Sequence, residues 1–206
     1  YNDSRITEFT CFLDASKAFD RVNHDVLCMK LTSQGVPSYI VRILLFWLSS
    51  QHFYVKWGSH CSAPFRVSNG VRKGGLLSPI FFNVYMYDLC IRLNSCRIGC
   101  CFNDSKLNHL MYADDIVLLA PSVKGLDQLI TICHSYGLEN DIIYNAKKSY
   151  IVPFRKGAKS LTITPSLKLG TTPIPVSEKI KYLGCILMHN LSDAEDISRQ
   201  TRYIYA

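Results

Sequence analysis

The segment LNHLMYADDIVLLA, residues 107–120, places two adjacent aspartates, Asp114 and Asp115, between two apolar runs. The runs at residues 107–111 and 116–120 predict the strands of a β-hairpin with the carboxylates at its tip. An adjacent Asp pair is common in an ordinary solvated turn, but these flanks would bury the hairpin almost to its tip. Carboxylates held this close repel each other, and a divalent cation such as Mg²⁺, which takes oxygen ligands, would relieve the repulsion.

A third aspartate stands at the end of another predicted strand. Apolar residues alternate over residues 7–13 and run directly into Asp14. If the two strand ends lie side by side, Asp14, Asp114 and Asp115 converge. Three carboxylates so placed could hold two metal ions about 4 Å apart, an arrangement that stabilises the attacking and leaving oxygens in phosphoryl displacement.

The composition is that of a globular chain with a mild basic excess. The 206 residues are 48% hydrophobic, enough for one large domain or one and a half small ones, and the net charge is +7. A basic excess fits a polyanionic partner, although weakly. Nine scattered cysteines lack zinc spacing and favour reduced thiols in an intracellular protein. The most apolar helical stretch, residues 40–48, is too short to span a bilayer.

The remaining pattern mixes helices and strands without strict βαβ alternation, which predicts an α+β fold. Ser38 is expected to cap a strongly apolar helix. Residues 153–175 are expected to form loops and one exposed hairpin. Helices are expected over residues 22–33, 38–50, 78–93 and 126–136, and further strands over residues 53–57, 64–68, 142–144 and 150–154, with a last apolar segment at 180–188.

Five segments, in order, resemble the motifs of reverse transcriptases. Their residues and spacing resemble those of non-LTR retrotransposon polymerases. The resemblance runs from about residue 6 to about residue 190. The segments are FLDASKAFD (residues 12–20) for the first catalytic motif, RKGGLLSP (72–79) for the loop that touches the incoming nucleotide, YADD (112–115) for the Tyr-x-Asp-Asp box, NAKKS (145–149) for the motif that follows it, and YLG (182–184) for the segment that grips the primer.

This resemblance implies a polymerase palm, an antiparallel sheet backed by helices, with partial fingers elements and the start of a thumb. Residues 1–190 would form the palm with partial fingers, including a primer-grip segment near 180–188. Residues 191–206 would form the truncated start of the thumb. Because the chain begins at Tyr1 and lacks a signal peptide, we expect it to start inside a larger reading frame.

The implied activity is RNA-directed DNA polymerisation, with two-metal nucleotidyl transfer from a dNTP to a primer 3′-hydroxyl. The implied partners are an RNA template, a DNA primer and dNTPs, without a membrane. Lys148 matches the family's candidate general acid for the pyrophosphate leaving group, although a solvated surface lysine beside Lys147 is the plainer alternative. The implied ligands of two Mg²⁺ ions, or of Mn²⁺ in their place, are Asp14, Asp114, Asp115 and the carbonyl of Ala15.

The resemblance also implies two sets of substrate contacts. Phe19 matches the bulky residue under the sugar, where a ring would clash with a 2′-hydroxyl and favour DNA synthesis; simple core packing is the alternative. The implied nucleotide contacts are Ser16, Lys17, Ala18, Phe19, Arg72, Lys73 and Gly74. The implied primer contacts are Tyr112, Tyr182, Leu183 and Gly184.

One departure keeps a second hypothesis open. The family usually carries Gln where this chain has Lys73, and Lys cannot supply the paired donor and acceptor of an amide. The chain is therefore either the palm of an active enzyme or a non-catalytic, decayed retroelement fragment that at most binds nucleic acid. Phe19 disfavours an RNA-templated RNA polymerase. We expect the endonuclease, the rest of the fingers and the thumb to be absent, and the resemblance implies a nuclear or cytoplasmic ribonucleoprotein location.

Overall fold

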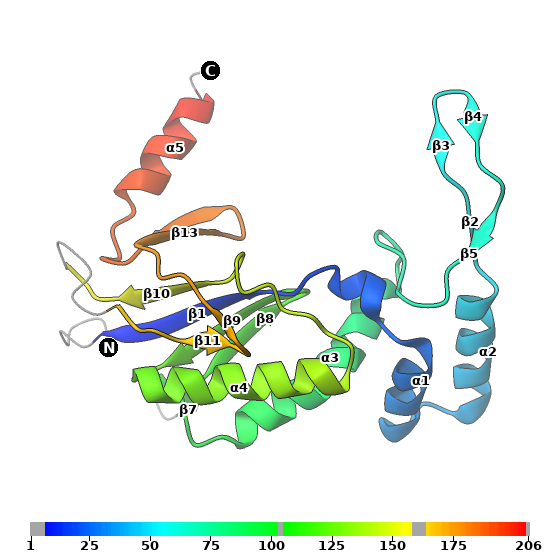
Figure 1. The fold of residues 1–206 in the computed structure, drawn as a ribbon, viewed down its shortest axis with the longest axis horizontal. Coiled ribbons are helices and arrows are strands. Elements are labelled where there is room, and N and C mark those ends of the chain that lie inside the picture. The colour runs from blue at the N-terminus through cyan, green and yellow to red at the C-terminus, as the bar shows by residue number, and fades with distance from the viewer. Residues whose placement is uncertain (1–6, 103–104, 158–163, 205–206) are drawn as a thin grey trace. The chain divides into compact units, whose positions relative to one another are not determined.

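The computed structural model describes residues 7–102, 105–157 and 164–204 (Figure 1). The chain divides into two compact units built from segments that are distant in sequence. Unit 1 comprises Tyr1–Ala15, Leu89–Ser135 and Tyr144–Ala206, and unit 2 comprises Ser16–Asp88 and Tyr136–Ile143. Helices α3 (Ser78–Ser95) and α4 (Val123–Glu139) contribute residues to both units.

Unit 1 is built on a four-stranded antiparallel sheet with the strand order β10-β1-β9-β8. Its strands are β1 (Glu8–Asp14), β8 (His109–Tyr112), β9 (Asp115–Ala120) and β10 (Tyr150–Phe154). The central strands, β1 and β9, are buried along most of their length. Burial on both faces explains why these strands are continuous apolar runs in the sequence.

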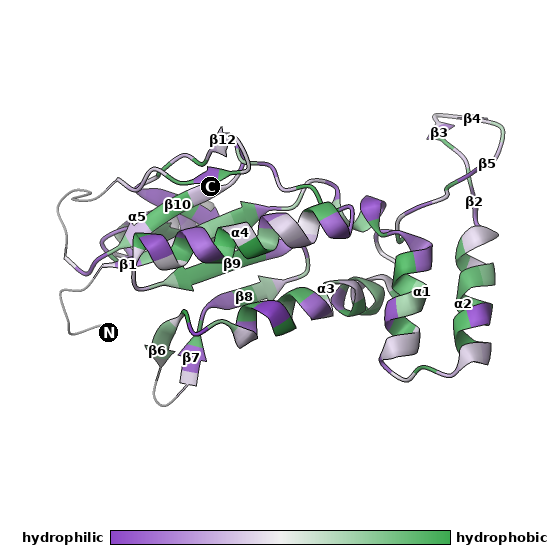
Figure 2. Cartoon of the chain, turned by 60° about the horizontal axis from the view of Figure 1, so that its bottom comes forward, coloured by the Kyte–Doolittle hydropathy of each residue, from purple (hydrophilic) through white to green (hydrophobic). Residues whose placement is uncertain are grey.

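Both faces of the sheet are covered within unit 1. On one face lies α4, whose residues Leu126, Leu129, Ile130 and Cys133 are buried at helical spacing (Figure 1). Figure 2 shows that β9 is largely hydrophobic, whereas α4 carries polar residues as well as hydrophobic ones. The other face carries a cluster of Phe12, Val117 and Val152, against which Ile180, Tyr182 and Leu187 pack. These three come from the hairpin β13 (Lys179–Tyr182) and β14 (Cys185–Met188).

Shorter elements complete unit 1. Two of them are small hairpins, and α5 packs against β14. They are β6 (Cys100–Phe102) with β7 (Ser105–Leu107), β11 (Lys168–Leu169) with β12 (Thr172–Pro173), and α5 (Ala194–Ile204).

Unit 2 is mainly helical and carries a long hairpin. The side chain of Asn23 accepts hydrogen bonds from the N–H groups of Asp25 and Val26, which starts α1. Helix α2 packs against α1, and the hairpin follows it. The elements are η1 (Ala18–Arg21), α1 (His24–Ser33), α2 (Ser38–Ser49), β2 (His52–Phe53), β3 (Lys56–Trp57), β4 (His60–Cys61) and β5 (Phe65–Arg66).

The α+β class is confirmed, two local predictions are wrong, and one hairpin was not predicted. Ser38 is not the cap of α2: Pro37 holds that position, and its fixed φ suits the start of a helix. Residues 142–144 form no strand, only a single bridge between Tyr144 and Ala15. The β6–β7 hairpin was not predicted. The expected hairpin within residues 153–175 is β11–β12, although part of that range, residues 158–163, lies outside the described residues.

The division into two units does not coincide with the boundary predicted near residue 190. The assignment of residues 1–190 to palm and fingers and of 191–206 to a thumb therefore stays a prediction. Within the described ranges, no helix combines the length and apolar character needed to cross a membrane, and no disulfide joins the cysteines.

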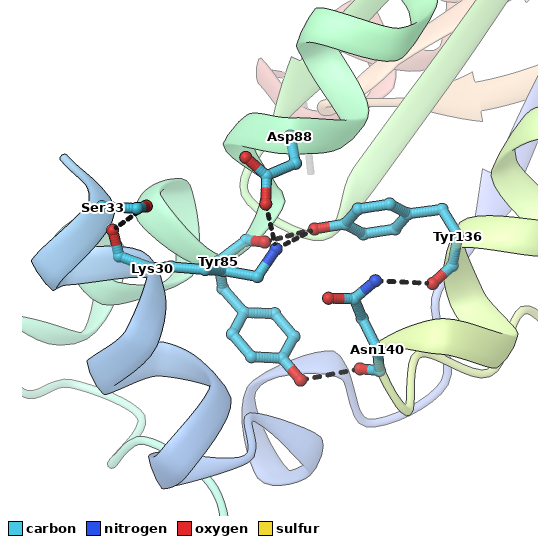
Figure 3. A network of polar contacts seen from close by, with 6 residues as sticks. All are labelled: Lys30, Ser33, Tyr85, Asp88, Tyr136 and Asn140. Carbon is cyan, nitrogen blue, oxygen red and sulfur yellow. Dashed lines mark hydrogen bonds and ion pairs between the residues drawn. The ribbon is translucent and has the colours of Figure 1, made fainter.

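A buried lysine ties the helical segments of unit 2 together (Figure 3). Nζ of Lys30 in α1 lies 2.6 Å from Oδ2 of Asp88 in α3 and donates to the Tyr136 hydroxyl at 2.9 Å. The ammonium also lies 5.4 Å from the ring centroid of Tyr85 and 5.1 Å from that of Tyr136. The hydroxyl of Tyr85 donates to the carbonyl of Asn140. A buried charge with these partners fixes α1, α3 and the end of α4 against one another.

Substituting Lys30 tests this network. Lys30→Ala should lower the free energy of unfolding by about 2–3 kcal/mol. It leaves Asp88 and the Tyr136 hydroxyl without the ammonium and removes the packed aliphatic part of the lysine side chain. Lys30→Met keeps the stem and should cost less. Urea unfolding followed by circular dichroism measures both changes. Lys124→Ala, at an exposed position of α4, is the control, and an equal cost for all three substitutions would contradict the assignment.

Candidate active site

Strand pairing in unit 1 sets two of the predicted carboxylates opposite each other. Asp14 is the last residue of β1 and pairs in register with Asp115, the first residue of β9. Residues directly opposite in an antiparallel pair have Cβ atoms about 4.5–5.5 Å apart on the same face. On its other side Asp115 pairs with Tyr112 of β8. The two strand ends therefore lie side by side.

Asp114 lies in the two-residue turn between β8 and β9. The turn is strained, because Ala113 has a φ of 53° in the left-handed region. Successive side chains along an extended chain point to opposite sides, so neighbours in sequence such as Asp114 and Asp115 do not automatically share a face. No three His, Cys, Asp or Glu side chains in the described part of the chain gather closely enough to hold a metal ion. Pairing therefore joins two of the three predicted carboxylates, with the third next to them in the turn.

The electrostatics show how close the acidic groups are. The pKa of Asp115 is raised, first by burial and then by the charges of Asp114 and Asp14. Burial and the charge of Asp115 likewise raise the pKa of the Tyr182 hydroxyl. The strand ends thus concentrate negative charge in a partly desolvated place, and oxygen donors of this kind suit a hard divalent cation.

A turn formed by residues 145–149 holds Asp14 in place. Strand β10 pairs with β1 only as far as Phe12. Beyond it, the N–H of Asp14 donates to Oγ of Ser149 at 3.1 Å, and the carbonyl of Asp14 accepts the N–H of Asn145 at 2.8 Å. Ser149 is fully buried and donates its hydroxyl to the carbonyl of Asn145. Ser149 is therefore a positioning residue, and it was not among the predicted site residues.

Ala15 follows Asp14 and is buried. It forms an isolated antiparallel bridge with Tyr144. The hydrogen bond from Asn145 that accompanies this bridge goes to the carbonyl of Asp14, not to that of Ala15. The Ala15 carbonyl, the predicted fourth ligand, therefore takes no part in that hydrogen bond.

A pocket of about 560 Å³ opens next to the paired carboxylates. Lys148, the predicted general acid, is exposed and lines this pocket. Two further lysines, Lys179 and Lys181, were not predicted; they alternate with Ile180 and Tyr182 along β13. The residues with charge or a hydroxyl that line the pocket are Asp14, Asp115, Lys148, Tyr150, Ser177, Lys179, Lys181, Tyr182 and Glu195. The pocket thus combines carboxylates with three lysines, one of which, Lys179, forms an ion pair with Glu195.

The segment predicted to grip the primer forms the tight end of the β13–β14 hairpin. Tyr182 closes β13, and its ring centroid lies 5.3 Å from that of Phe12. Leu183 and Gly184 form the turn, both with positive φ. The fourth predicted primer contact, Tyr112, is exposed at the end of β8.

Every predicted nucleotide contact belongs to unit 2. Lys17, Arg72, Lys73 and Gly74 are exposed and Ser16 is half-buried. Ala18 is buried, so its methyl group is not available to a nucleotide. Phe19 is half-buried and stacks on Phe82, with ring centroids 4.6 Å apart. The stacking holds the ring in one orientation.

Backbone hydrogen bonds fasten the two nucleotide segments of unit 2 to each other. The N–H of Gly70 donates to the carbonyl of Val22 at 2.7 Å, and the N–H of Val71 to that of Phe19 at 2.8 Å. A Cβ at Gly70 would lie 2.8 Å from the carbonyl oxygen of Asp20, so this close approach requires glycine. Lys73 and Arg72 line a second pocket in unit 2, of about 350 Å³, together with Asp20 and His24.

Sequence comparison identifies the class of protein that this sheet and its paired carboxylates belong to. Residues 2–187 match the reverse transcriptase (RNA-dependent DNA polymerase) family, and the chain belongs to that family. The predicted family is therefore confirmed.

The relatives are polymerases of non-LTR retrotransposons. The chain is 29% identical over 178 residues to the Pol polyprotein of the type-2 retrotransposable element R2DM of Drosophila melanogaster, covering 84% of this chain and 17% of the relative. It is 28% identical over 202 residues to the probable RNA-directed DNA polymerase from transposon BS of the same species, covering 94% and 21%. The chain thus spans about a fifth of the length of these relatives.

Telomerases are among the solved structures with this fold. The telomerase of Candida tropicalis in complex with a fragment of telomeric RNA superposes with a TM-score of 0.63 at 14% identity, covering 96% of this chain and 31% of that one. The telomerase of Candida albicans gives a TM-score of 0.56 at 18% identity, covering 90% and 30%. At these identities the likeness concerns the fold, and it confirms the α+β palm-like architecture.

Removing the Ser149 hydroxyl tests its support of Asp14. Ser149→Ala should lower the free energy of unfolding by about 1–2 kcal/mol, because a buried N–H loses its acceptor. Urea unfolding measures the change. Thr131→Ala is the matched control, since that residue is exposed and its hydroxyl donates to a carbonyl of its own helix. A cost for Ser149→Ala as small as that of the control would show that Asp14 does not depend on this hydroxyl.

Proposed function

We propose that this chain is the catalytic palm portion of an RNA-directed DNA polymerase that transfers nucleotides from dNTPs to a primer 3′-hydroxyl by two-metal chemistry. The observation that carries the proposal is the register of Asp14 with Asp115 at adjacent strand ends. The pairing supports the proposal because, in a chain of the reverse transcriptase family, the two motifs that carry these aspartates are the ones expected to supply the metal ligands.

The donor set fits a hard divalent cation. Asp14 and Asp115 face each other, Asp114 is close enough to raise the pKa of Asp115, and all three offer carboxylate oxygens. No three acidic side chains of the described residues lie close enough together to hold a metal ion, so these residues, with the carbonyl of Ala15, would draw together around Mg²⁺, or around Mn²⁺ in its place. When bound, the metal pair would supply charge stabilisation for the attacking and leaving oxygens.

The other side chains have roles that follow from their places. Lys148 lines the pocket beside Asp14 and Asp115, so it can donate a proton to the pyrophosphate leaving group. The β13–β14 turn, with Tyr182, Leu183 and Gly184, would hold the primer end, aided by Tyr112. In unit 2, the exposed Lys17, Arg72 and Lys73 would neutralise triphosphate charge. The RNA template, the DNA primer and the ribonucleoprotein location belong to the same proposal.

The competing hypothesis is a decayed fragment that binds nucleic acid without catalysis. The observation that favours it is Lys73, an exposed cation where the family usually carries Gln. The intact carboxylate pair favours the catalytic hypothesis, because two facing acids destabilise a fold unless they serve a ligand.

Primer extension on poly(rA)/oligo(dT) with Mg²⁺, in a longer chain that supplies fingers and thumb, distinguishes the hypotheses. Asp14→Asn and Asp115→Asn should each abolish extension, because each removes a charged ligand oxygen. Asp127→Asn, an exposed acid on α4, should leave extension unchanged. Extension by Asp14→Asn at the parental rate would refute the metal role. Failure of the parental chain itself would support the decayed fragment.

Sugar selection gives a second prediction in the same longer chain. Phe19→Ala should admit ribonucleotides, because the ring held against Phe82 is the group that a 2′-hydroxyl would meet. An apolar pocket without such a clash rejects an added hydroxyl by only about a hundredfold. Phe19→Tyr keeps the ring and should keep the discrimination. The measurement is the ratio of kcat/KM for dNTP over rNTP, in which a general loss of activity cancels.

An unchanged ratio for Phe19→Ala would leave Phe19 as a packing residue. Its stacking on Phe82 would then be its whole role, and the preference for DNA synthesis would depend on other residues.

A further inference from the structure

One stretch of unit 2 carries basic residues and no acidic ones. Residues 26–87 contain six lysines and arginines and not one Asp or Glu, whereas the whole chain has a net charge of +7. One of the six, Lys30, is neutralised by Asp88. The other five are Arg42, Lys56, Arg66, Arg72 and Lys73, and all of them are exposed. A local excess of this size attracts a polyanion.

In the middle of this stretch stands a hairpin, residues 52–66, which we call the arm. Its base is the pair β2–β5, with Phe53 opposite Phe65, and its outer part is the pair β3–β4, with Trp57 opposite His60. Gly58, with a φ of 58°, begins the two-residue turn at its tip. Figure 1 shows the arm extending beyond the end of α2, within unit 2.

The arm exposes aromatic side chains that contribute little to a core. Every residue from 54 to 69 is exposed. Trp57 at the tip is 84% exposed and Tyr54 is 63% exposed. Large aromatic side chains usually stabilise a protein by being buried. Two exposed aromatic side chains on a hairpin contribute little to stability, so we infer that they serve to contact a ligand.

Cations alternate with these aromatics along the arm. Lys56 precedes Trp57, and Arg66 follows Phe65. Nε of Arg66 donates to Nε2 of His52 at 3.2 Å, which holds the guanidinium at the base of the arm while its terminal nitrogens take no part in that bond. Ser59 and Ser62 lie between Trp57 and Phe65, so polar groups interrupt the apolar residues along this part of the arm.

We propose that the arm is a binding surface for single-stranded nucleic acid, in which Trp57 and Tyr54 stack on unpaired bases while Lys56 and Arg66 contact phosphates. Stacking accepts any base, because every base has a π-face, and cations track the backbone. The absence of acidic residues removes the repulsion that a phosphate chain would otherwise meet. This binding needs no catalysis and no metal, so it stands or falls separately from the proposed polymerase chemistry.

The two tryptophans of the chain make the test direct. Trp47→Phe leaves Trp57 as the only tryptophan, and the Phe keeps a ring beside Phe81. Titration of this variant of the 206-residue chain with oligo(U) and oligo(dT) should quench the Trp57 emission. The oligonucleotides are about 16 nucleotides long, the upper end of the site size of a small binding domain. Tighter binding of oligo(U) would assign the surface to RNA, and tighter binding of oligo(dT) to DNA; either supports the proposal.

Substitutions in the otherwise unchanged chain separate stacking from charge. Trp57→Ala should raise the Kd of a labelled oligonucleotide about tenfold, and Trp57→Phe should restore most of the affinity. Lys56→Ala and Arg66→Ala should each lower the slope of log K against log salt by about 0.7. The controls are Leu138→Ala, an apolar residue 75% exposed on α4, and Lys124→Ala, and both should leave Kd and slope unchanged.

Two results would overturn the proposal. One is the absence of oligonucleotide binding at low salt. The other is binding that leaves the Trp57 emission unchanged and that Trp57→Ala does not weaken, which would place the nucleic acid elsewhere on the chain. Because Trp57 packs on so little of the protein, loss of folding does not confuse the outcome, and circular dichroism checks it.

Discussion

The antiparallel pairing of β1 with β9 is the constraint on which unit 1 depends. It sets Asp14 opposite Asp115 and also decides which side chains of β1 meet α4 and which meet the β13–β14 hairpin. A slip of one residue would turn every side chain of the strand to the other face. Such a slip would place Phe12 on the wrong side and separate the carboxylates. The packing of the core and the geometry of the acidic site are therefore specified by the same register.

The acidic site lowers the stability of the sheet that carries it. Burial and the neighbouring charges raise the pKa of Asp115, and the turn beside it holds Ala113 in a strained conformation. Support comes from the turn of residues 145–149, whose buried Ser149 hydroxyl accepts the N–H of Asp14 beyond the end of the strand pairing. Repulsion at a well-supported strand end is expected of a site that is complete only with a cation.

Unit 2 uses charge in two different ways. Lys30 is buried among Tyr85, Tyr136 and Asp88 and serves the packing of helices. The other cations of residues 26–87 are exposed, and two of them lie on the arm. The same residue type therefore stabilises the fold at one position and is available to a polyanion at others, and only burial and partners distinguish the two.

The sequence by itself determined the strand that ends in Asp14, the two strands on either side of the Asp114–Asp115 pair, the α+β class and the family, because each depends on local periodicity or on an ordered set of motifs. It did not determine that Ser149 supports Asp14, that Lys179 and Lys181 rim the pocket, or that Lys30 is buried. It also predicted a strongly apolar helix at residues 38–50 without showing that Phe46 is 74% exposed. Those facts depend on contacts between segments far apart in the chain. A local pattern indicates which residues favour burial and which carry a charge. The residues that they pack against or bind are decided only when distant segments of the chain come together in the folded structure.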